Sequence, residues 1–176
     1  MSGVIETIHS RRSVREFSDK KVEDDKVLSV LDAGRWAPSA VNNQPWRFIV
    51  VSKRETLNSL AELTVDSRIL ENAAVAIAVF LDKNVRVGGD YRTKNVLSMG
   101  ACVENMLIAA HSLGLGAVWL GEILKNKEKI NDILEAPSSF EPVAVVAIGY
   151  PIQKERTSQR SELKEIAYSE KYGVPI

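Results

Sequence analysis

The sequence has almost no cysteine and no excess of charge of either sign. Cys102 is its only cysteine, which excludes an internal disulfide and any multi-cysteine zinc or iron–sulfur site and favours a reducing compartment. Lys plus Arg and Asp plus Glu each number 23 in 176 residues. No global field therefore attracts nucleic acid or an anionic membrane, and we expect neither as a partner.

Long apolar runs are missing as well. The longest, Ala73 to Leu81, is less than half of the roughly 20 residues that a membrane helix needs. The first residues, MSGVIETIHSRRS, do not contain the apolar stretch of a signal peptide. These absences predict a soluble, cytoplasmic protein.

What is present indicates one α+β domain over residues 1–176. Hydrophobic residues make up 45% of the chain and charged residues 26%, enough for one packed core, and no linker or repeat divides the chain. Periodicity predicts helices within residues 2–10, 24–38, 95–116 and 123–136, and strands within 46–52, 73–81, 117–121 and 141–151. The helix of 95–116 is apolar nearly all round, which places it centrally, with Gly114 and Gly116 as candidates for its C-cap.

The segment RRSVR is the most suggestive polar cluster. Arg11, Arg12 and Arg15 surround Ser13 just after a predicted helix end, where guanidinium groups and a hydroxyl suit a phosphate. A solvated basic turn has the same composition, and residue types alone favour that simpler interpretation. The glycines at 114 and 116 follow a helix instead of a strand, so they are not a dinucleotide fingerprint.

No set of side chains suggests acid–base or nucleophilic catalysis. Cys102 has apolar neighbours and no nearby cation, so it is predicted to be a core residue. Neither histidine lies at metal-ligand spacing from a cysteine or carboxylate, and for His111 packing or a contact with the helix dipole is the simpler role. If the protein is an enzyme, we expect a cofactor to carry its chemistry.

Three blocks of the sequence resemble the nitroreductase family of flavin oxidoreductases. They are IHSRRSVREFSDKKVEDDKVLSVLDAGRWAPSAVNNQPWRFIVV, ENMLIAAHSLGLGAVWLGE, and AIGYP followed by a charged tail. The resemblance spans nearly the whole chain. It implies a central mixed β-sheet flanked by helices and an FMN-binding homodimer with both flavins at the subunit interface. It also implies that a C-terminal segment, about residues 153–176, crosses to the partner. Composition alone leaves a frayed terminus equally open for this tail.

The resemblance also implies which residues contact FMN. Arg11, Arg12, Ser13 and Arg15 match residues that reach its phosphate, ribityl chain and pyrimidine edge. Pro38, Ser39, Ala40 and Asn42 match a loop that meets the flavin of the other subunit. Trp119, Leu120 and Gly121 match a strand end along the ring, and Arg160 matches a late phosphate contact. Ser158 stands where relatives often carry a second basic residue, so its assignment is the weakest.

The implied activity is hydride transfer from NADH or NADPH, through FMN, to a small electron acceptor in ping-pong turnover. Only residues 83–90 separate the strand of 73–81 from the next element, too few for a large lid. An open pocket for flat acceptors such as nitroaromatics or quinones is therefore expected. The sequence leaves open the physiological acceptor and the choice between NADH, NADPH and a deazaflavin donor. A flavin storage or sensing module is the alternative, and a nucleic-acid-binding scaffold without flavin is a more distant one.

The stretch WAPSAVNNQPWRF, residues 36–48, is predicted to be a stiff loop between a helix and a strand. Pro38 ends the helix, and Pro45 leads back into the core. Trp36 and Trp46 are expected to pack instead of stacking on flavin. Asn42 is the amide expected to contact the cofactor, and Asn43 has no assigned role.

Overall fold

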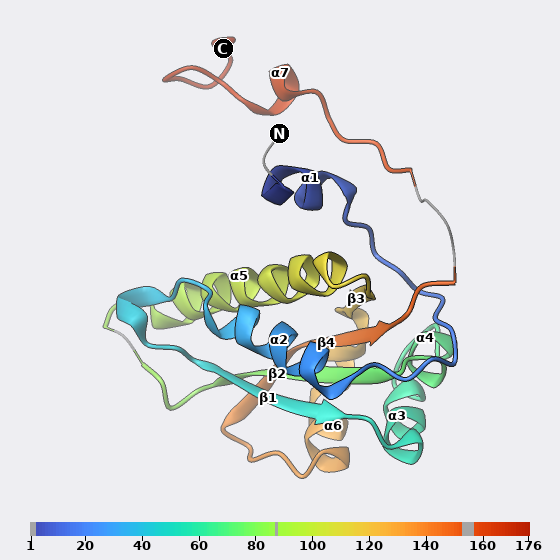
Figure 1. Cartoon of the computed structure of the whole chain (residues 1–176). Coiled ribbons are helices and arrows are strands. Elements are labelled where there is room, and N and C mark those ends of the chain that lie inside the picture. Colours follow the sequence, from blue (N-terminus) through green and yellow to red (C-terminus); the bar gives the residue numbers. More distant parts are fainter. Residues whose placement is uncertain (1–2, 87, 153–156) are drawn as a thin grey trace.

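A four-stranded sheet forms the middle layer of the computed structural model, which describes residues 3–86, 88–152 and 157–176 (Figure 1). Its strands are β1 (Trp46–Val51), β2 (Val75–Asp82), β3 (Gly116–Leu120) and β4 (Phe140–Gly149), in the order β1-β2-β4-β3. Helices flank the sheet on both faces, which confirms the predicted α+β class.

All neighbouring strands of this sheet pair antiparallel. β2 and β3 run in the same direction and are joined through a helix, but β4 lies between them, so they do not pair with each other. Among the described residues, the parallel component expected of a mixed sheet is limited to an isolated bridge between Ser13 and Ala117.

β2 is buried on both faces, as its continuous apolar run predicts. Val75, Ile77 and Val79 pack into the core beneath one helical layer, while Ala76 and Phe80 pack into the core beneath the other. Successive side chains of a strand point to opposite faces, so an all-apolar strand requires a cover on each side. Among the described residues, the buried hydrophobic side chains thus fall into two clusters, one on each face of this sheet.

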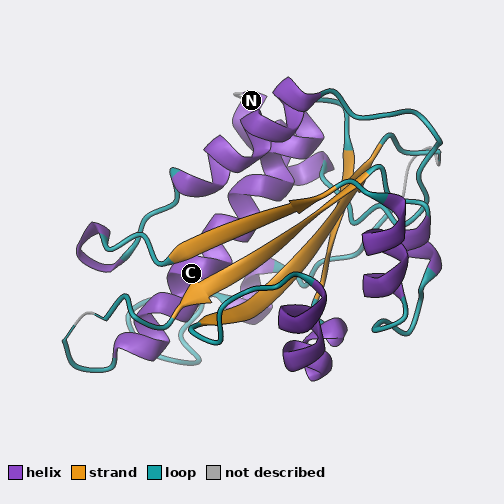
Figure 2. Cartoon of the chain, turned by 90° about the horizontal axis from the view of Figure 1, so that it is seen from below, coloured by secondary structure: helices purple, strands orange, loops and turns teal. Residues whose placement is uncertain are grey.

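Two helical layers supply those covers (Figure 2). The first consists of α2 (Asp24–Arg35) and α5 (Tyr91–Ser112), and the second of α3 (Arg54–Ala61), α4 (Arg68–Glu71) and α6 (Lys127–Ile133). The helix predicted over 123–136 is divided into a 3₁₀ segment, η2 (Glu122–Asn126), and α6. The sequence pattern predicts no element in the region of α3 and α4. In the structure, tertiary packing buries the apolar side of these two short helices.

α5 is the central helix that the sequence predicts, although it begins earlier, at Tyr91. The Asp90 side chain caps it by accepting a hydrogen bond from the Thr93 amide at 3.2 Å. At its other end Gly114 takes a positive φ of 75°, as a helix C-cap requires, whereas Gly116 already belongs to β3. Cys102 is fully buried in this helix, and burial raises the pKa of its thiol to about 12, so its prediction as a core residue is confirmed.

The two terminal segments lie outside this core. α1 (Gly3–Ser10) has no buried residue, and α7 (Leu163–Ile166) belongs to an arm that stands away from the body of the molecule (Figure 1). Leu163, Ile166, Tyr172 and Ile176 of this arm are between 62% and 89% exposed. Apolar side chains that remain this exposed contribute no free energy of burial within a single chain. Among the described residues, no helix has the length and apolar character that crossing a bilayer requires.

The segment after α1 runs along the edge of the sheet beside β3 and the end of β4. The Val14 amide donates to the Ala117 carbonyl at 3.0 Å, and the Ser18 amide donates to the Tyr150 carbonyl at 2.8 Å. Gly116 makes this approach possible, because a Cβ there would lie 2.7 Å from the side chain of Val14. The position of the arginine–serine cluster is therefore set by backbone pairing to β3.

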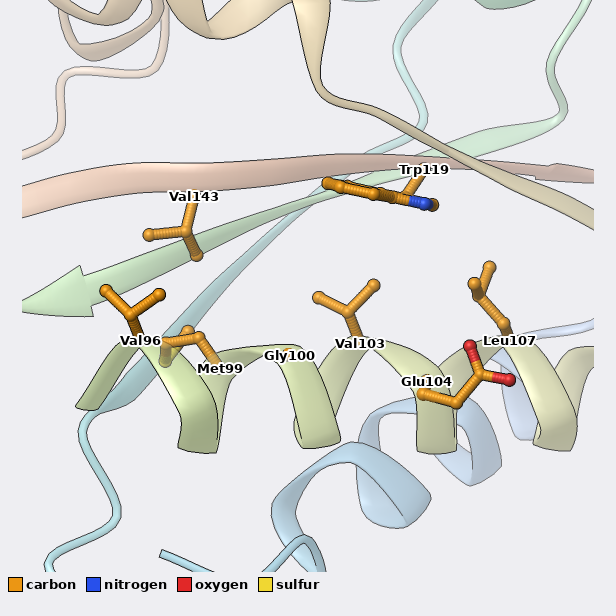
Figure 3. A pocket seen from close by; sticks show the side chains of 8 residues that line it. All are labelled: Val96, Met99, Gly100, Val103, Glu104, Leu107, Trp119 and Val143. Atoms are coloured by element: carbon orange, nitrogen blue, oxygen red, sulfur yellow. The ribbon is translucent and has the colours of Figure 1, made fainter. Parts of the chain in front are cut away.

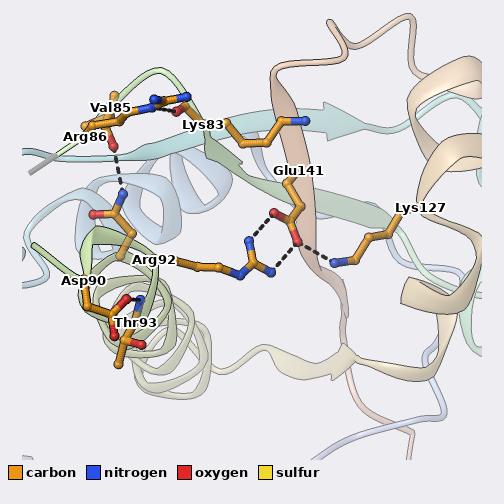
Figure 4. Close-up of polar contacts among 9 residues, drawn as sticks. Lys83, Val85, Arg86, Asp90, Arg92, Thr93, Lys127 and Glu141 are labelled. Carbon is orange, nitrogen blue, oxygen red and sulfur yellow. Dashed lines mark hydrogen bonds and ion pairs between the residues drawn. The ribbon is translucent and has the colours of Figure 1, made fainter.

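An ionic cluster connects the start of α5 to β4 and α6 (Figure 4). Both Nη atoms of Arg92 donate to the Glu141 carboxylate, at 2.8 and 3.1 Å, and Lys127 Nζ approaches it to 2.6 Å. The hydrogen bonds from Arg92, followed by those from Lys127, lower the pKa of Glu141 to about 2. The Glu141 side chain is only 15% exposed, whereas its partners Arg92 and Lys127 are 60% and 41% exposed, so water reaches the cluster from the cationic side.

We predict that Gly116→Ala displaces the arginine–serine segment. The new methyl group overlaps Val14, so the bond between Val14 and Ala117 should break, and the free energy of unfolding should fall by about 1–3 kcal/mol. Urea denaturation measures the loss. Gly3→Ala is the matched control, because nothing lies within 4 Å of a Cβ there. Equal stability of the two variants would show that the contact is not tight.

We predict that Glu141 stabilises the fold in a pH-dependent way. Its pKa is lowered in the folded state, so its contribution is complete above the unfolded pKa near 4.5 and is lost as the pH falls toward about 2. Glu141→Gln should cost on the order of 3 kcal/mol at pH 7, and the difference from wild type should shrink between pH 5 and pH 2. Denaturation at several pH values measures this. Glu55→Gln, at an exposed carboxylate, should show no such convergence.

Candidate functional site

The arginine–serine segment places three cations beside the end of α1. Arg11 is mostly buried, and its Nε lies 3.4 Å from a carboxylate oxygen of Glu104 on α5. Arg12 donates to the carbonyls of His9 and Arg11 at 2.6 and 2.8 Å. Arg15 is exposed, and the structure records no hydrogen bond or ion pair from its side chain to a described residue. Of the three, Arg15 is thus the cation most accessible to an anion from outside.

His111 adds a neutral side chain to this electropositive region. It lies in the last turn of α5, where its Nε2 is 2.8 Å from Ser10 Oγ. Burial lowers the pKa of His111, and the positive charges of Arg11 and Arg12 lower it further. The ring links the last turn of α5 to α1. The described residues contain no cluster of three or more potential metal ligands.

The end of β3 borders an apolar cavity of about 300 Å³ between the sheet and α5 (Figure 3). Trp119 forms one wall and is 50% exposed, while Val103 and Leu107 of α5 lie opposite it. Glu104 supplies the one carboxylate of the lining, and it is the same carboxylate that pairs with Arg11. The cationic segment and the flat apolar wall therefore meet at this carboxylate.

Leu120 and Gly121 follow Trp119 along the chain. The Leu120 side chain is buried in the core on the opposite face of the sheet, so only its backbone can serve a site beside Trp119. Gly121 is half-buried and directly precedes the 3₁₀ segment η2. A Cβ at Gly121 would lie 3.3 Å from the Trp119 ring. The absence of a side chain keeps the backbone beside that ring open.

The loop that contains Pro38, Ser39, Ala40 and Asn42 is tightly wound. It includes a short 3₁₀ turn, η1 (Ala40–Asn42), and the Ser39 hydroxyl accepts a hydrogen bond from the Gln44 amide at 3.0 Å. Val41, Asn42 and Gln44 all have positive φ values, of 47°, 57° and 48°. For a β-branched residue such as Val41 this region costs of order 1–3 kcal/mol. Asn42 is exposed, so its amide is available to a ligand.

The two tryptophans of this stretch have different environments. Trp46 is 6% exposed and packs in the core, as predicted. Trp36 is 72% exposed, so its predicted packing role is wrong for the single chain. It follows the last residue of α2, and its only recorded ring contact among the described residues is with the Arg35 guanidinium.

The predicted site residues form two groups at opposite ends of α5 (Figure 1). Asn43 bonds to Asn95 near the start of the helix, whereas Ser10 contacts His111 in the last turn. At about 1.5 Å of rise per residue, roughly 24 Å of helix separates Asn95 from His111. Arg11 contacts Glu104, about 14 Å of helix from Asn95, so loop 38–44 and the arginine–serine segment of one chain lie apart along α5.

The C-terminal assignments are the least constrained. Arg160 donates to the Ser158 hydroxyl at 2.7 Å and to the Gln159 carbonyl at 3.0 Å. Both side chains are exposed, and their recorded bonds within the described residues do not reach the arginine–serine segment. Residues 153–156 at the start of the predicted arm lie outside the described residues.

Sequence reasoning missed three polar residues of this region. Glu104 pairs with Arg11, and Asn43 and Asn95 join loop 38–44 to α5. Asn43 Nδ2 donates to Asn95 Oδ1 at 2.7 Å, which gives Asn43 the role that it lacked. A signal was present, because Asn95 and Glu104 are polar residues in a helix that is otherwise apolar nearly all round.

Family-level and pairwise sequence comparisons match this chain to related proteins. The sequence matches the Nitroreductase family over residues 8–67 and 61–150. A candidate NADH dehydrogenase/NAD(P)H nitroreductase from Methanothermobacter thermautotrophicus is 36% identical over 157 residues, which cover 88% of this chain and 80% of that protein. An FMN reductase (NAD(P)H) from Bacillus subtilis is 24% identical over 187 residues, which cover 98% and 75% of the two chains.

A solved structure agrees with the fold as well. The crystal structure of a candidate nitroreductase from Desulfovibrio desulfuricans, in complex with FMN, superposes with a TM-score of 0.89. The two sequences are 38% identical, and the match covers 98% of this chain and 99% of the other. The family match spans most of the chain, and two of these relatives exceed 30% identity over nearly its full length. The chain belongs to the nitroreductase family.

Proposed function

We propose that the protein is an FMN-dependent oxidoreductase that takes hydride from NADH or NADPH and delivers it to a small electron acceptor in ping-pong turnover. We further propose that it acts as a homodimer with two flavin sites at the subunit interface. One observation supports the proposal most: loop 38–44 and the arginine–serine segment contact α5 at separate places along its length, which suits a site that takes one group from each of two chains.

The residues of the cationic group fit the chemistry of FMN. The phosphate needs cations and hydrogen-bond donors, which Arg11, Arg12 and Ser13 offer, while Arg15 is exposed and accessible to the pyrimidine edge. The isoalloxazine ring is flat and largely apolar, and it fits the wall formed by Trp119 and α5. Relatives named for FMN reduction, and one solved with FMN, support the same cofactor.

Each group of residues has a separate task in this proposal. Bound FMN supplies the redox chemistry, by accepting and donating hydride. Arg15 places positive charge near the pyrimidine edge, which favours the reduced, anionic form. Gly121 leaves its backbone amide accessible beside the ring without adding a titrating group. Asn42 and Ser39 come from the partner and orient the ring. No general acid or base is required, in accord with the absence of a candidate in the sequence.

The C-terminal arm supports the proposed dimer. Its apolar side chains are exposed in the single chain, as are Val4 and Ile8 of α1. Burial against a partner would remove this apolar surface from water, which stabilises association. Because the arm carries Ser158 and Arg160, its exchange would also bring the late arginine to a phosphate in the assembled site.

The acceptor is proposed to be flat and electrophilic, such as a nitroaromatic or a quinone. The connection between β2 and α5 is too short to form a lid, and the cavity beside Trp119 is lined mainly by apolar side chains. A flat acceptor stacks on the exposed ring face after the nicotinamide leaves. Hydride transfer to such an acceptor depends on how the acceptor is positioned against the flavin ring more than on proton transfer by a side chain.

The test of this function is reduction of bound flavin. We expect the purified, FMN-loaded protein to be yellow, to bleach on addition of NADH or NADPH, and to regain its colour with menadione or nitrofurazone. Arg15→Gln should raise the FMN dissociation constant about tenfold or more, because a charge-assisted hydrogen bond is lost, and should slow the bleaching. Arg15 is exposed, so thermal stability without flavin should not change.

Lys129→Gln is the control, because Lys129 is an exposed cation on α6, which covers the face of the sheet opposite α5. It should leave affinity and bleaching unchanged. A yellow protein that no reduced nicotinamide bleaches would instead indicate a flavin storage or sensing module. A colourless protein that cannot be loaded with FMN would overturn the proposal. It would favour the alternative of a scaffold that binds nucleic acid through RRSVR.

We predict that the arm drives dimerisation. Introducing charge with Leu163→Asp and Ile166→Asp should raise the dimer dissociation constant at least tenfold for each substitution, because each buried aliphatic side chain contributes about 1.5–3 kcal/mol. Lys164→Asp lies in the same short helix and is the control. Sedimentation velocity measures assembly, and circular dichroism confirms folding. A dimer that survives both apolar substitutions would contradict arm exchange.

A further inference from the structure

We propose that Asn95, on α5, is a positioning residue for the flavin site: its buried amide holds loop 38–44 in the conformation that presents Asn42 and Ser39 to the partner's flavin. The inference rests on the proposed function only for the identity of the ligand. The hydrogen bonds that carry it lie within one chain.

Asn95 connects three segments that are distant in sequence. Its side chain is 1% exposed, its Nδ2 donates to the Val85 carbonyl at 2.8 Å, and its Oδ1 accepts from Asn43 Nδ2 at 2.7 Å. The amide thus joins α5, the connection that follows β2, and loop 38–44. The nitrogen of the planar amide makes the first of these bonds, and its oxygen makes the second.

The Val85 carbonyl fixes the orientation of both amides. A carbonyl oxygen only accepts, so the nitrogen of Asn95 must face it, and the oxygen of Asn95 must then face Asn43. Asn43 in turn must present its nitrogen. Its oxygen is buried and has no hydrogen-bond partner among the described residues. The pair can therefore adopt only one arrangement, and Asn43 cannot exchange its two ends without losing its bond to α5.

The loop needs such a constraint because it is strained. Three residues, Val41, Asn42 and Gln44, have positive φ values, and such conformations persist only where surrounding contacts overdetermine them. Asn43 lies between two of the strained residues, and its side chain bonds outside the loop. Ser39 adds a second bond, but this bond lies within the loop and cannot place it relative to α5.

The first turn of α5, which precedes Asn95, is anchored at two points. Asp90 caps the first turn of α5, and Arg92 fixes that turn to Glu141 of β4 (Figure 4). Val85 lies beside this turn, with its carbonyl hydrogen-bonded to α5. Through its bond to Asn43, Asn95 therefore fixes the exposed loop 38–44 relative to this anchored end of α5. It acts through Asn43 and does not itself reach a ligand.

The test combines hydrogen exchange of the flavin-free protein with FMN titration. Asn95→Leu keeps the shape of the side chain and removes both hydrogen bonds. We expect the amides of Asn42, Asn43 and Gln44 to exchange at least tenfold faster, and FMN to bind about tenfold more weakly. Ser98→Ala is the matched control, because Ser98 is also buried on α5 but its hydroxyl bonds within the same helix, to the Lys94 carbonyl at 2.9 Å.

Two further comparisons separate positioning from general stability. Amides of α3, distant from Asn95, should exchange at the wild-type rate in Asn95→Leu; acceleration there equal to that in loop 38–44 would show global destabilisation and overturn the inference. Asn43→Ala combined with Asn95→Leu should weaken FMN binding no more than either substitution alone, because the two residues act as one unit. Additive losses would overturn it as well.

The outcomes also distinguish this inference from the proposed function. If wild type binds FMN and Asn95→Leu binds it equally well with unchanged loop exchange, the positioning role is wrong and the function stands. If wild type does not bind FMN but the loop exchanges faster in Asn95→Leu, the function is wrong and the structural link stands.

Discussion

The packing of α5 against the sheet is the constraint on which the rest of the structure depends. The helix has 22 residues, and its buried face fills the core above β2 and β4. Its length fixes the distance between the loop that Asn95 holds and the cationic segment that Glu104 and His111 contact. One rigid element thus sets the separation of these two groups in a single chain, and the proposed two-chain site follows from that separation.

The cationic half of the site depends on backbone contacts more than on side chains. Gly116 lets Val14 approach the edge of β3, and Gly149 allows Phe17 a similar approach at the end of β4. These two contacts align the segment that carries Arg11 and Arg15 with the sheet. The charges are therefore presented on a fixed backbone, although Arg15 itself has no partner among the described residues. In the proposed site, an anion could therefore bind Arg15 without breaking a recorded side-chain contact among the described residues.

Several predictions held because their cause is local in the sequence. The period of apolar residues defines α2 and α5, and the continuous apolar run defines β2 as a strand covered on both faces. Glycine at 114 marks the end of α5, since few other residues accept its φ. Predictions failed where a partner distant in sequence decides the outcome. Trp36 was expected to pack, but the direction in which the chain leaves α2 exposes it. Asn43 had no role until the fold placed Asn95 beside it.

The sequence by itself determined the family and the α+β class, because motif spacing and periodicity are local properties of the chain. Only the tertiary structure decided the antiparallel pairing of all four strands, since β4 inserts between β2 and β3. It also decided that Arg11 pairs with Glu104, and that Asn95 holds a strained loop. These contacts join residues between 52 and 93 positions apart in the chain. No local pattern predicts them, because they form only when the helix and the sheet pack together.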